Sequence, residues 1–510
     1  MVFCQPVFAL SQGTQSREEI AFKNIHLLEP ADSLEVRLFK AARVVPSRRQ
    51  LNWQAKELAA FIHFGLNTFT DRELGEGTED PALFNPAAFD PGQWTRVLKE
   101  AGFKMIIITA KHHDGFCLWP TETTGYSVKK SPWQKGGGDV VRAVATACRQ
   151  EGLAFGFYLS PWDRHEKSYG TPAYNEFFRA QLTELLTNYG PVAEVWFDGY
   201  CGEGPNGRKQ EYDWGSYYEL IRRLQPEAVI AISGPDVRWV GNESGLGRET
   251  EWSVLPLARP EEELAKLSRG EISLDRIFQP LNLMGEDLGS QEKILQARAL
   301  FWYPAEVDVS IRPGWFYHQN QDNQVKTGQE LFKIYLESAG RNSVLLLNVP
   351  PDRRGLLADE DIRALQDFKG LVESSFKKDL ATGARIRASS TMAGRPVESV
   401  ISNIPGKYWL AEDGVKPVII ELVLRDEAIF NCLELQEEIS LGQRIEAFKL
   451  ESWDGKSWRQ IVNGTTAGYK RLITFPEISA KKLRLVITSF RSVPTLKKIG
   501  LYKLAVSVIN

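Results

Sequence analysis

Acidic and imidazole side chains recur where apolar, strand-like runs of this 510-residue sequence end. The run VAEVWFDGY ends near Asp198, AAFIHFGL contains His63, and KMIIITAKHHDGF ends with the neighbouring pair His112 and His113. Asp before Gly is ordinary turn chemistry, because the Asp side chain bonds the following backbone and Gly accepts a positive φ. A turn explains one such motif, but it does not explain why histidines stand at the equivalent places of other strands.

Two carboxylates among aromatic and imidazole side chains are typical of glycoside hydrolysis. One carboxylate attacks the sugar or activates water, and the other protonates the departing oxygen and therefore needs a raised pKa. Asp198, fixed at a strand end beside Trp196, suits the nucleophile. Glu243 lies on a longer loop and suits the acid/base. Glu249 and Glu251 in the same loop, GNESGLGRETEW, remain alternatives that spacing does not separate.

The histidines are predicted to hydrogen-bond sugar hydroxyls as neutral imidazoles. Neighbouring residues on a strand point to opposite faces, so His112 and His113 enter one site together only if the strand has already ended. The chain has six His and shows neither HxH nor HExxH spacing, which argues against a set of metal ligands. We therefore expect no metal, and the absence of GxGxxG after the first strand argues against a dinucleotide cofactor.

The elements that must position these residues alternate between strand-like and helix-like runs from about residue 58. Fully apolar strands that alternate with amphipathic helices indicate a parallel sheet covered by helices. Seven or eight such units over roughly 300 residues favour an α/β fold of the (β/α)8-like barrel type, with catalytic groups at the carboxyl ends of the strands. The expected strands are 59–66, 104–116, 153–163, 192–200, 228–243, 301–311 and 342–351, and the expected helices are 91–102, 139–152, 175–190, 216–226 and 328–340. The part from about 255 to 300 shows no clear pattern.

After about residue 370 the helical periodicity stops. Short alternating runs separated by turn residues, such as AFKLESWDGKSW and KKLRLVITS, indicate an antiparallel β-sandwich domain. The predicted organisation is an N-terminal extension over 1–35, a catalytic barrel over 36–355, a linker helix over 356–375 and a sandwich over 376–510. The apolar start MVFCQPVFALSQG lacks a basic segment and is compatible with the remnant of an export signal.

The overall composition narrows the choice of partners. A formal net charge of −3 suggests neither nucleic acid nor an anionic membrane surface as a partner. The sequence contains no run of about 18 apolar residues, so it predicts no membrane span. The 14 Trp suit a sugar-binding protein, in which flat rings pack against sugar C–H faces. The five Cys are odd in number and lack CxxC spacing, so we expect free thiols that are mostly buried.

Four motifs of the predicted barrel, IHFGLNTFT, KHHDGFCLW, VWFDG and RWVGNESG, resemble glycoside hydrolase family 29, the retaining α-L-fucosidases. The resemblance covers residues 50–350 and implies Asp198 as nucleophile and Glu243 as acid/base. It implies a fucosylated oligosaccharide or glycoconjugate as partner, no cofactor, and a secreted or periplasmic location. With Glu73 and Arg238 added from this sequence, the expected contacts to the fucose are His63, Glu73, His112, His113, Tyr158, Trp196, Arg238 and Trp315.

The GNE form of the Glu243 loop is similar to the branch of that family that acts on terminal α-1,3/4-linked fucose in Lewis-type glycans. That branch commonly shows Glu-Trp where this chain has Glu73-Leu74, so one aromatic contact to the sugar is replaced. Two other functions remain open: a retaining exo-glycosidase for a related L-sugar, and a glycan-binding protein without catalysis. The presence of both carboxylates argues against the second.

The C-terminal sandwich resembles discoidin (coagulation factor type C) modules and family 32 carbohydrate-binding modules. The matching stretches are ASSTMAG, QRIEAFKLESWDGKSW, GTTAGYKR and KKLRLVITS. These motifs consist mainly of core and turn residues, so they predict a fold more strongly than a binding site. Packing against the barrel and sugar binding both remain open, because a fold does not determine a function.

Overall fold

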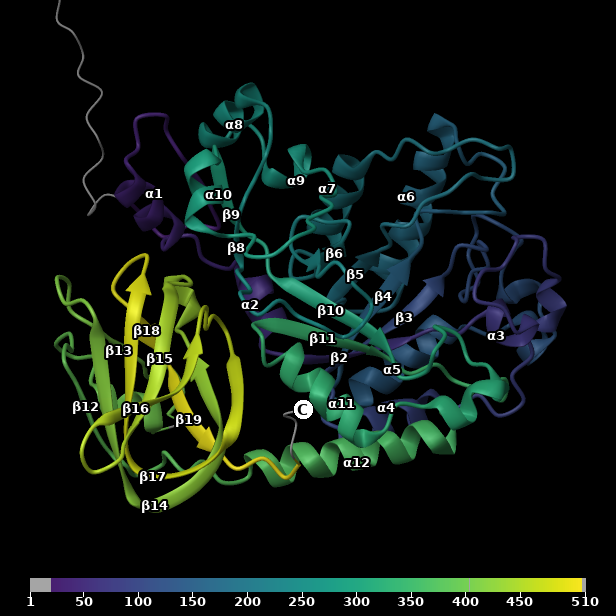
Figure 1. Cartoon of the computed structure of the whole chain (residues 1–510). Coiled ribbons are helices and arrows are strands. Elements are labelled where there is room, and N and C mark those ends of the chain that lie inside the picture. The colour runs from purple at the N-terminus through teal and green to yellow at the C-terminus, as the bar shows by residue number, and fades with distance from the viewer. Residues whose placement is uncertain (1–19, 403, 507–510) are drawn as a thin grey trace, which may run out of the picture.

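In the computed structural model, which describes residues 20–402 and 404–506, a barrel and an antiparallel β-domain lie side by side (Figure 1). The apolar N-terminal segment that we interpret as an export-signal remnant lies outside the described residues. None of the helices within the described ranges is both long and apolar enough to cross a membrane.

Eight parallel strands form the barrel, and the predicted (β/α)8-like architecture is confirmed. In hydrogen-bonded order they are β6 (Val229–Ile232), β5 (Glu194–Phe197), β4 (Ala154–Leu159), β3 (Met105–Lys111), β2 (Leu58–Ile62), β11 (Ser343–Asn348), β10 (Ala305–Ser310) and β7 (Arg238–Trp239). The two strands at the ends of this order, β6 and β7, contact each other, so the barrel is nearly closed.

Helices on the outside of the barrel begin and end at the residues that the sequence marks. The Asp139 side chain caps α5 by accepting a hydrogen bond from Arg142 N, and Gly152 ends this helix with a φ of 72°. Glycine adopts such a positive φ without strain. The helices that follow barrel strands are α4 (Pro91–Glu100), α5 (Val140–Glu151), α6 (Pro172–Asn188), α7 (Trp214–Leu224), α11 (Gly328–Glu337) and α12 (Asp359–Phe376).

One βα unit of the barrel lacks its helix. The run expected as a single strand over 228–243 divides into β6 and β7, and residues 233–237 join them directly. The stretch Ser233-Gly234-Pro235-Asp236 is a turn signal that marks this break, and the single expected strand overlooked it. The Gly234 backbone packs against Ile230, where a Cβ would lie 2.4 Å from a methyl group.

The segment that showed no clear pattern folds beside the barrel as short elements. It contains β8 (Val254–Pro256), α8 (Glu261–Ser268), α9 (Leu274–Ile277), α10 (Gln291–Gln296) and β9 (Ala299–Trp302). The strand β1 (Ile25–Leu27), which falls within the predicted N-terminal extension, pairs antiparallel with β9. The short helices α1 (Leu34–Ala41), α2 (Arg48–Gln54) and α3 (Leu66–Thr70) complete this half of the chain.

Alternation along the strands divides the barrel into two layers of side chains. On β5, Val195 and Phe197 pack outwards in the large cluster beneath the helices, whereas Trp196 joins the cluster inside the barrel. Phe61 of β2 and Tyr158 of β4 lie in the same inner cluster. Polar side chains that point to the same side of a strand as this inner cluster therefore reach the end of the barrel interior.

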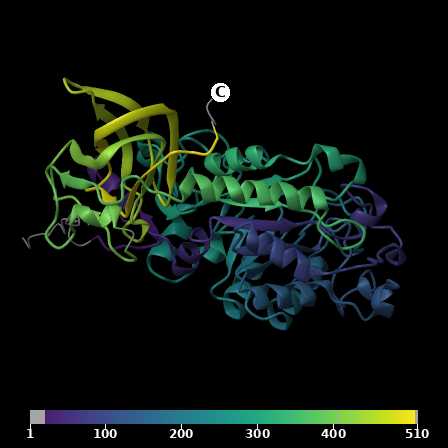
Figure 2. The same ribbon diagram turned by 90° about the horizontal axis from the view of Figure 1, so that it is seen from below.

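The C-terminal domain is antiparallel, as predicted, and has its own hydrophobic core. Helix α12 runs along the barrel towards this domain, as seen from below in Figure 2. The main sheet is built from β12 (Arg385–Ala388), β14 (Val418–Gln436), β17 (Arg471–Phe490), β15 (Ile445–Trp453) and β16 (Trp458–Gly464), with β19 (Lys498–Tyr502) paired to β14, and β13 (Trp409–Leu410) pairs with β18 (Thr495–Leu496).

The cysteines of the described residues are free thiols, as expected from their spacing. Cys117, Cys148 and Cys432 are buried and Cys201 is half-buried. Burial raises the pKa of Cys148 and of Cys201 to about 12, which keeps both as neutral thiols. Cys4 lies outside the described residues.

Candidate active site

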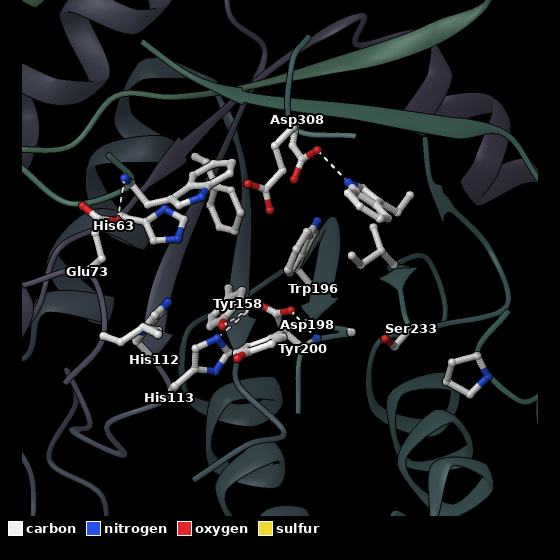
Figure 3. Close-up of a pocket in the computed structure, with 18 of the residues that line it drawn as sticks. His63, Glu73, His112, His113, Tyr158, Trp196, Asp198, Tyr200, Ser233 and Asp308 are labelled. Carbon is white, nitrogen blue, oxygen red and sulfur yellow. Dashed lines mark hydrogen bonds and ion pairs between the residues drawn. The ribbon is translucent and has the colours of Figure 1, made fainter. Parts of the chain in front are cut away.

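A pocket of about 740 Å³ opens at the carboxyl ends of the barrel strands (Figure 3). Side chains that end or follow β2, β3, β4, β5, β7 and β10 meet there, where parallel barrels carry their catalytic groups. Except for Arg238, the predicted site residues all line this pocket: His63, Glu73, His112, His113, Tyr158, Trp196, Asp198, Glu243 and Trp315.

Asp198 directly follows β5 and is held by two hydrogen bonds (Figure 3). Its Oδ1 accepts the backbone N–H of Tyr200 at 2.7 Å, and its Oδ2 accepts the Tyr158 hydroxyl at 3.0 Å. Burial raises the pKa of Asp198, and both hydrogen bonds oppose the rise because they stabilise the carboxylate. The Asp-Gly pair thus makes the turn that its sequence indicates, while 21% of the Asp198 side chain stays exposed to the pocket.

The hydrogen bonds of Asn348 determine the tautomer of His63. Asn348 Nδ2 donates to the Trp315 carbonyl at 2.7 Å, so its Oδ1 is the atom that lies 2.9 Å from His63 Nδ1. His63 Nδ1 must therefore carry the proton, which leaves Nε2 as an acceptor. Burial lowers the pKa of His63 to about 3, so the ring is neutral near pH 7.

His113 is held in the same way by Ser160. Ser160 Oγ donates to the Trp162 carbonyl at 2.6 Å, so it accepts from His113 Nδ1 at 2.7 Å. The unprotonated Nε2 of His113 then lies 3.5 Å from Asp198 Oδ2. Burial lowers the pKa of His113 to about 3, which makes this contact one between a neutral acceptor and a carboxylate. Such a pair suits a hydroxyl that donates to one of the two atoms.

His112 and His113 both enter the pocket because β3 ends at Lys111 before them. The His112 ring stacks on Tyr158 at 5.6 Å between centroids, and its buried Nδ1 has no hydrogen-bond partner in the described structure. Burial lowers the pKa of His112 well below its usual value. Within residues 20–402 and 404–506, no three or more His, Cys, Asp or Glu side chains form a group that could hold a metal ion.

Glu243 reaches the pocket from the loop over residues 240–253, which joins β7 to β8. A tight turn presents it: Ser244 N donates to Asn242 Oδ1 at 3.0 Å, and Asn242 Nδ2 donates to the Leu246 carbonyl at 2.9 Å. Partial burial raises the pKa of Glu243, a hydrogen bond with Trp315 lowers it, and the nearby charge of Asp198 raises it. A carboxyl group with a raised pKa beside a carboxylate is the arrangement that general acid catalysis requires.

The other two acids of this loop lie elsewhere. Glu249 points to the surface near Arg341, with 80% of its side chain exposed. Glu251 is buried between Arg238 and Arg248, with 1% of its side chain exposed. Neither lines the pocket, so the geometry separates three carboxylates that the sequence left equivalent.

Arg238, predicted as a substrate contact, lies behind the pocket wall. It is buried, its guanidinium pairs with Glu251, and its Nε donates to the Tyr303 carbonyl at 3.2 Å. Neighbours on a strand face opposite sides, and on β7 it is Trp239 that lines the pocket. The predicted contact between Arg238 and the substrate is therefore wrong, because the side chain of β7 that faces the pocket belongs to the next residue, Trp239.

Glu73 lines the pocket, but both of its carboxylate oxygens accept hydrogen bonds from the protein itself. Its Oε2 accepts the backbone N–H of Trp315 at 2.8 Å, and its Oε1 accepts from Phe316 N at 3.3 Å and lies 2.6 Å from His318 Nε2. Asp71 Oδ1 lies 2.7 Å from His318 Nδ1, and these hydrogen bonds outweigh burial and raise the pKa of His318. Glu73 therefore fixes the segment that presents Trp315.

Asp308 of β10 is a pocket carboxyl that the sequence interpretation missed. Its Oδ1 accepts from Trp239 Nε1 at 2.8 Å. Burial raises the pKa of Asp308 well above its usual value, the Trp239 hydrogen bond opposes this, and the Glu243 charge adds to it. The signal was present: Glu306 and Asp308 alternate with Val307 and Val309, so the polar residues occupy one face of the strand.

A second carboxyl pair lies inside the barrel below Trp196. Trp196 Nε1 donates to Glu306 Oε2 at 2.8 Å, and Trp53 Nε1 donates to Glu194 Oε2 at 2.8 Å. The remaining Oε1 atoms of both acids are buried and have no hydrogen-bond partner within the described residues. Burial raises the pKa of both groups, so they share at least one proton at neutral pH. The sequence interpretation assigned neither acid to the barrel interior, although the alternation along β10 marks Glu306.

Comparison with known proteins agrees with this geometry. Residues 49–371 match the alpha-L-fucosidase family, and residues 385–501 match the F5/8 type C domain. The chain is 42% identical to Alpha-L-fucosidase 1 of Arabidopsis thaliana over 467 residues, which cover 90% of this chain and 87% of that protein.

Solved structures show the same fold. A Bacteroides ovatus protein is 46% identical with a TM-score of 0.84, and the match covers 96% of this chain and 80% of that one. A family 29 fucosidase from Ruminococcus gnavus, solved in complex with fucose, is 34% identical with a TM-score of 0.80, and the match covers 90% of this chain and 95% of that one. Together with its site, these matches show that the chain belongs to the alpha-L-fucosidases of glycoside hydrolase family 29 and carries an F5/8 type C domain after its barrel.

Proposed function

We propose that this enzyme releases terminal α-L-fucose with retention of configuration, with Asp198 as nucleophile and Glu243 as acid/base. One observation carries the assignment: of the three acids in the 240–253 loop, Glu243 is the one that lines the pocket with Asp198. Its raised pKa suits the proton donor, and the hydrogen bonds on Asp198 suit a group that must stay ionised.

The two steps follow from these roles. Asp198 attacks the anomeric carbon, the glycosidic bond breaks, and the proton of Glu243 moves to the departing oxygen. Glu243 is then ionised and takes a proton from water. That water attacks the anomeric carbon, releases Asp198 and restores the first configuration. Retention requires the two carboxyl groups to stand about 5–5.5 Å apart when the sugar is bound.

The sugar contacts are assigned to the neutral histidines and the aromatic rings. The Nε2 atoms of His63 and His113 accept hydrogen bonds, because each Nδ1 is already committed to a protein oxygen. Trp196 and Trp315 supply flat apolar surface, and both rings pack near Phe61, at 5.1 and 6.4 Å between centroids. Tyr158 donates to Asp198 and serves the nucleophile. Glu73 acts through Trp315, as described above.

The linkage assigned is α-1,3/4 in Lewis-type oligosaccharides or glycoconjugates. The motif GNE around Glu243 is similar to that branch of the family. A branched aglycone needs a wide rim, and here Tyr200 is 61% exposed and Leu74 44% exposed beside Leu281 and Asn282. Leu74 has no ring where that branch commonly has Trp, so this contact to the sugar is weaker.

Two assays test the proposal. An aryl α-L-fucoside followed by NMR reports the first-formed anomer, and an initial β-anomer would contradict retention. A Lewis trisaccharide compared with an α-1,2-linked fucosyl-lactose tests the linkage, and we expect faster release from the Lewis sugar. Equal release from both would reject the linkage but leave the carboxylate roles intact.

Domain limits and location complete the proposal. We assign the catalytic barrel to 36–355, the linker to 356–375 and the sandwich to 376–510, supported by family matches over 49–371 and 385–501. A secreted or periplasmic location is supported by the family and by the F5/8 type C domain, which is compatible with an extracellular protein. Fractionation of the native host tests this location.

A further inference from the structure

The C-terminal domain contacts the last part of the loop that carries Glu243. The loop leaves β7 after Trp239 and returns to β8 at Val254. Residues 249–253, the last part of the loop, form with β7 a stem, because the Arg238 guanidinium of β7 pairs with the Glu251 carboxylate and also lies 3.4 Å from the Trp252 carbonyl. Whatever holds residues 249–253 therefore also holds the strand end from which Glu243 projects.

Gln443 of the C-terminal domain binds the stem as a second strand would. Its Nε2 donates to the Glu251 carbonyl at 2.9 Å, and its Oε1 accepts from Ser253 N at 2.8 Å. The Gln443 side chain is fully buried. An amide that satisfies a C=O and an N–H two residues apart fixes both the position and the direction of that backbone.

Two further residues of the domain contact the same stem. Thr465 Oγ1 lies 3.0 Å from Thr250 Oγ1 and donates to the Glu249 carbonyl at 3.2 Å. The Arg491 guanidinium stacks on the Trp252 ring at 3.3 Å. Gln443, Thr465 and Arg491 come from three separate segments of the domain, so the stem has contacts with all three.

The barrel supports the same contact through Asn342. Asn342 Nδ2 donates to the Glu251 carbonyl at 3.1 Å, and its Oδ1 accepts from Tyr469 N at 2.7 Å. Its backbone N donates to the Lys470 carbonyl at 2.8 Å, so the chain after α11 forms a short ladder with β17. The docking of the two domains and the position of the stem are therefore one hydrogen-bonded network.

The pocket side of the loop depends on this network as well. Arg248, which pairs with Glu251 at 3.6 Å, donates to the carbonyls of Gly285 and Leu283 at 2.6 and 3.0 Å. Residues 280–282, just before them, line the pocket. A shift of Glu251 would thus move both the Glu243 loop and the rim beside it.

We propose that the C-terminal domain positions the acid/base: Gln443, with Thr465 and Arg491, holds the stem so that Glu243 faces the glycosidic oxygen. These are positioning residues, because they lie outside the pocket lining and act through the loop. The proposal rests on the assigned role of Glu243. A displacement of about 1 Å at a catalytic group costs on the order of 10²-fold in rate, so modest loosening should be measurable.

The test uses substituted phenyl α-L-fucosides of similar size whose phenols differ in pKa, so that aglycone binding stays nearly constant. The full-length variants are Gln443→Met and Thr465→Val, with Gln291→Met as the matched control. Gln291 also makes a hydrogen bond between the domains, to Glu446 at 2.8 Å, and it is linked to the stem only indirectly, because Glu446 pairs with Arg491 at 3.2 Å. Glu243→Ala is measured alongside.

In Gln443→Met, kcat/KM should fall roughly 10-fold for the least acidic phenol and less than about 2-fold for the most acidic one, which needs little protonation. Thr465→Val should show a smaller change in the same direction, and Gln291→Met should keep the wild-type dependence. A loss of folded protein alone would lower all substrates equally. If Gln443→Met fails to fold, Thr465→Val decides.

The outcomes separate the two proposals. A steeper dependence on phenol pKa in Glu243→Ala and in the stem variants supports both. A steeper dependence in Glu243→Ala with wild-type behaviour in Gln443→Met and Thr465→Val overturns the positioning role. Wild-type dependence in Glu243→Ala overturns the acid/base assignment, and the positioning role with it. An equally steep dependence in Gln291→Met also overturns the positioning role of Gln443, because any loosening of the contact between the domains would then be enough to change the dependence.

Discussion

The two proposed catalytic carboxylates are held in different ways. Asp198 sits at the end of β5, and its partners, Tyr158 and Tyr200, come from the adjacent strand and from its own turn. Glu243 sits on a loop whose stem is held by Asn342, Gln443 and Thr465. The nucleophile side is thus determined by local sequence and the sheet, whereas the acid/base side depends on contacts distant in sequence. This difference makes the acid/base the more adjustable of the two groups.

Replacing the nucleophile should have the largest effect. In Asp198→Ala no glycosyl-enzyme forms, so turnover should fall by roughly 10⁴-fold or more on every substrate. Added azide should restore activity and give a fucosyl azide of inverted configuration, because the anion attacks from the side of the missing carboxylate. NMR of the azide product checks this. A retained azide product would contradict the nucleophile assignment.

Replacing the acid/base should have a smaller effect that depends on the leaving group. Glu243→Ala should lose roughly 10²–10⁴-fold on a Lewis-type substrate, whose sugar leaving group needs protonation. On an aryl fucoside with an acidic phenol the first step should persist, and a covalent intermediate should accumulate, detectable by mass spectrometry of the protein. Azide should then give a retained product.

Glu249→Ala is the control for that variant. Glu249 belongs to the same loop but faces solvent. We expect its rates to stay within about twofold of wild type, since surface substitutions away from special features change little. If Glu249→Ala showed the dependence on leaving group and Glu243→Ala did not, the acid/base would be misassigned.

Much of the nucleophile side could be predicted, because alternation and strand ends are visible in sequence. The runs that end at His63, His112 and Asp198 each carry their polar residue where the strand stops. The acid/base side was harder. Its loop has no periodicity, and Arg238 and Trp239 occupy a two-residue strand whose phase follows only from its pairing with β10.

Other features depend on contacts that no single segment reveals. Glu194 and Glu306 are 112 positions apart, on β5 and β10, and only the closed barrel brings them together. Gln443 belongs to a motif that looks like core and turn of the C-terminal domain, yet its amide binds the catalytic barrel. The sequence predicted the fold of that domain and left its role open, because the binding partner is a backbone segment about 190 residues earlier.

Glu194 lies on β5, the strand that Asp198 follows, and Glu306 lies on β10, which pairs with β7 on the acid/base side. This pair should affect stability more than rate. Burial raises the pKa of Glu194 from 4.5 to about 8. The folded state therefore keeps a proton that the unfolded state loses, so stability is full below about pH 4.5 and falls as the pH rises towards about 8. Glu194→Gln, a neutral mimic, should show a smaller fall in Tm between pH 5 and pH 8, by roughly 2 °C or more.

Glu249→Gln is the matched control for this measurement, because Glu249 is exposed and should leave the pH dependence of Tm unchanged. The kcat of Glu194→Gln should stay near wild type, since Trp196 keeps its bond to Glu306. An unchanged pH dependence in Glu194→Gln would show that the pair does not hold the extra proton.

The smallest expected effect is that of a chelator. In His63 and His113, Nδ1 is already bound to a protein oxygen, and the free Nε2 atoms belong to neutral rings that suit sugar hydroxyls. Metal binding would instead require several ligand atoms within about 2.0–2.3 Å of one point. Prolonged dialysis against EDTA should therefore leave kcat/KM on an aryl fucoside unchanged. If activity were lost and then restored by zinc, the histidines would be ligands, and the contrast between the nucleophile side and the acid/base side would have to be rebuilt around a metal.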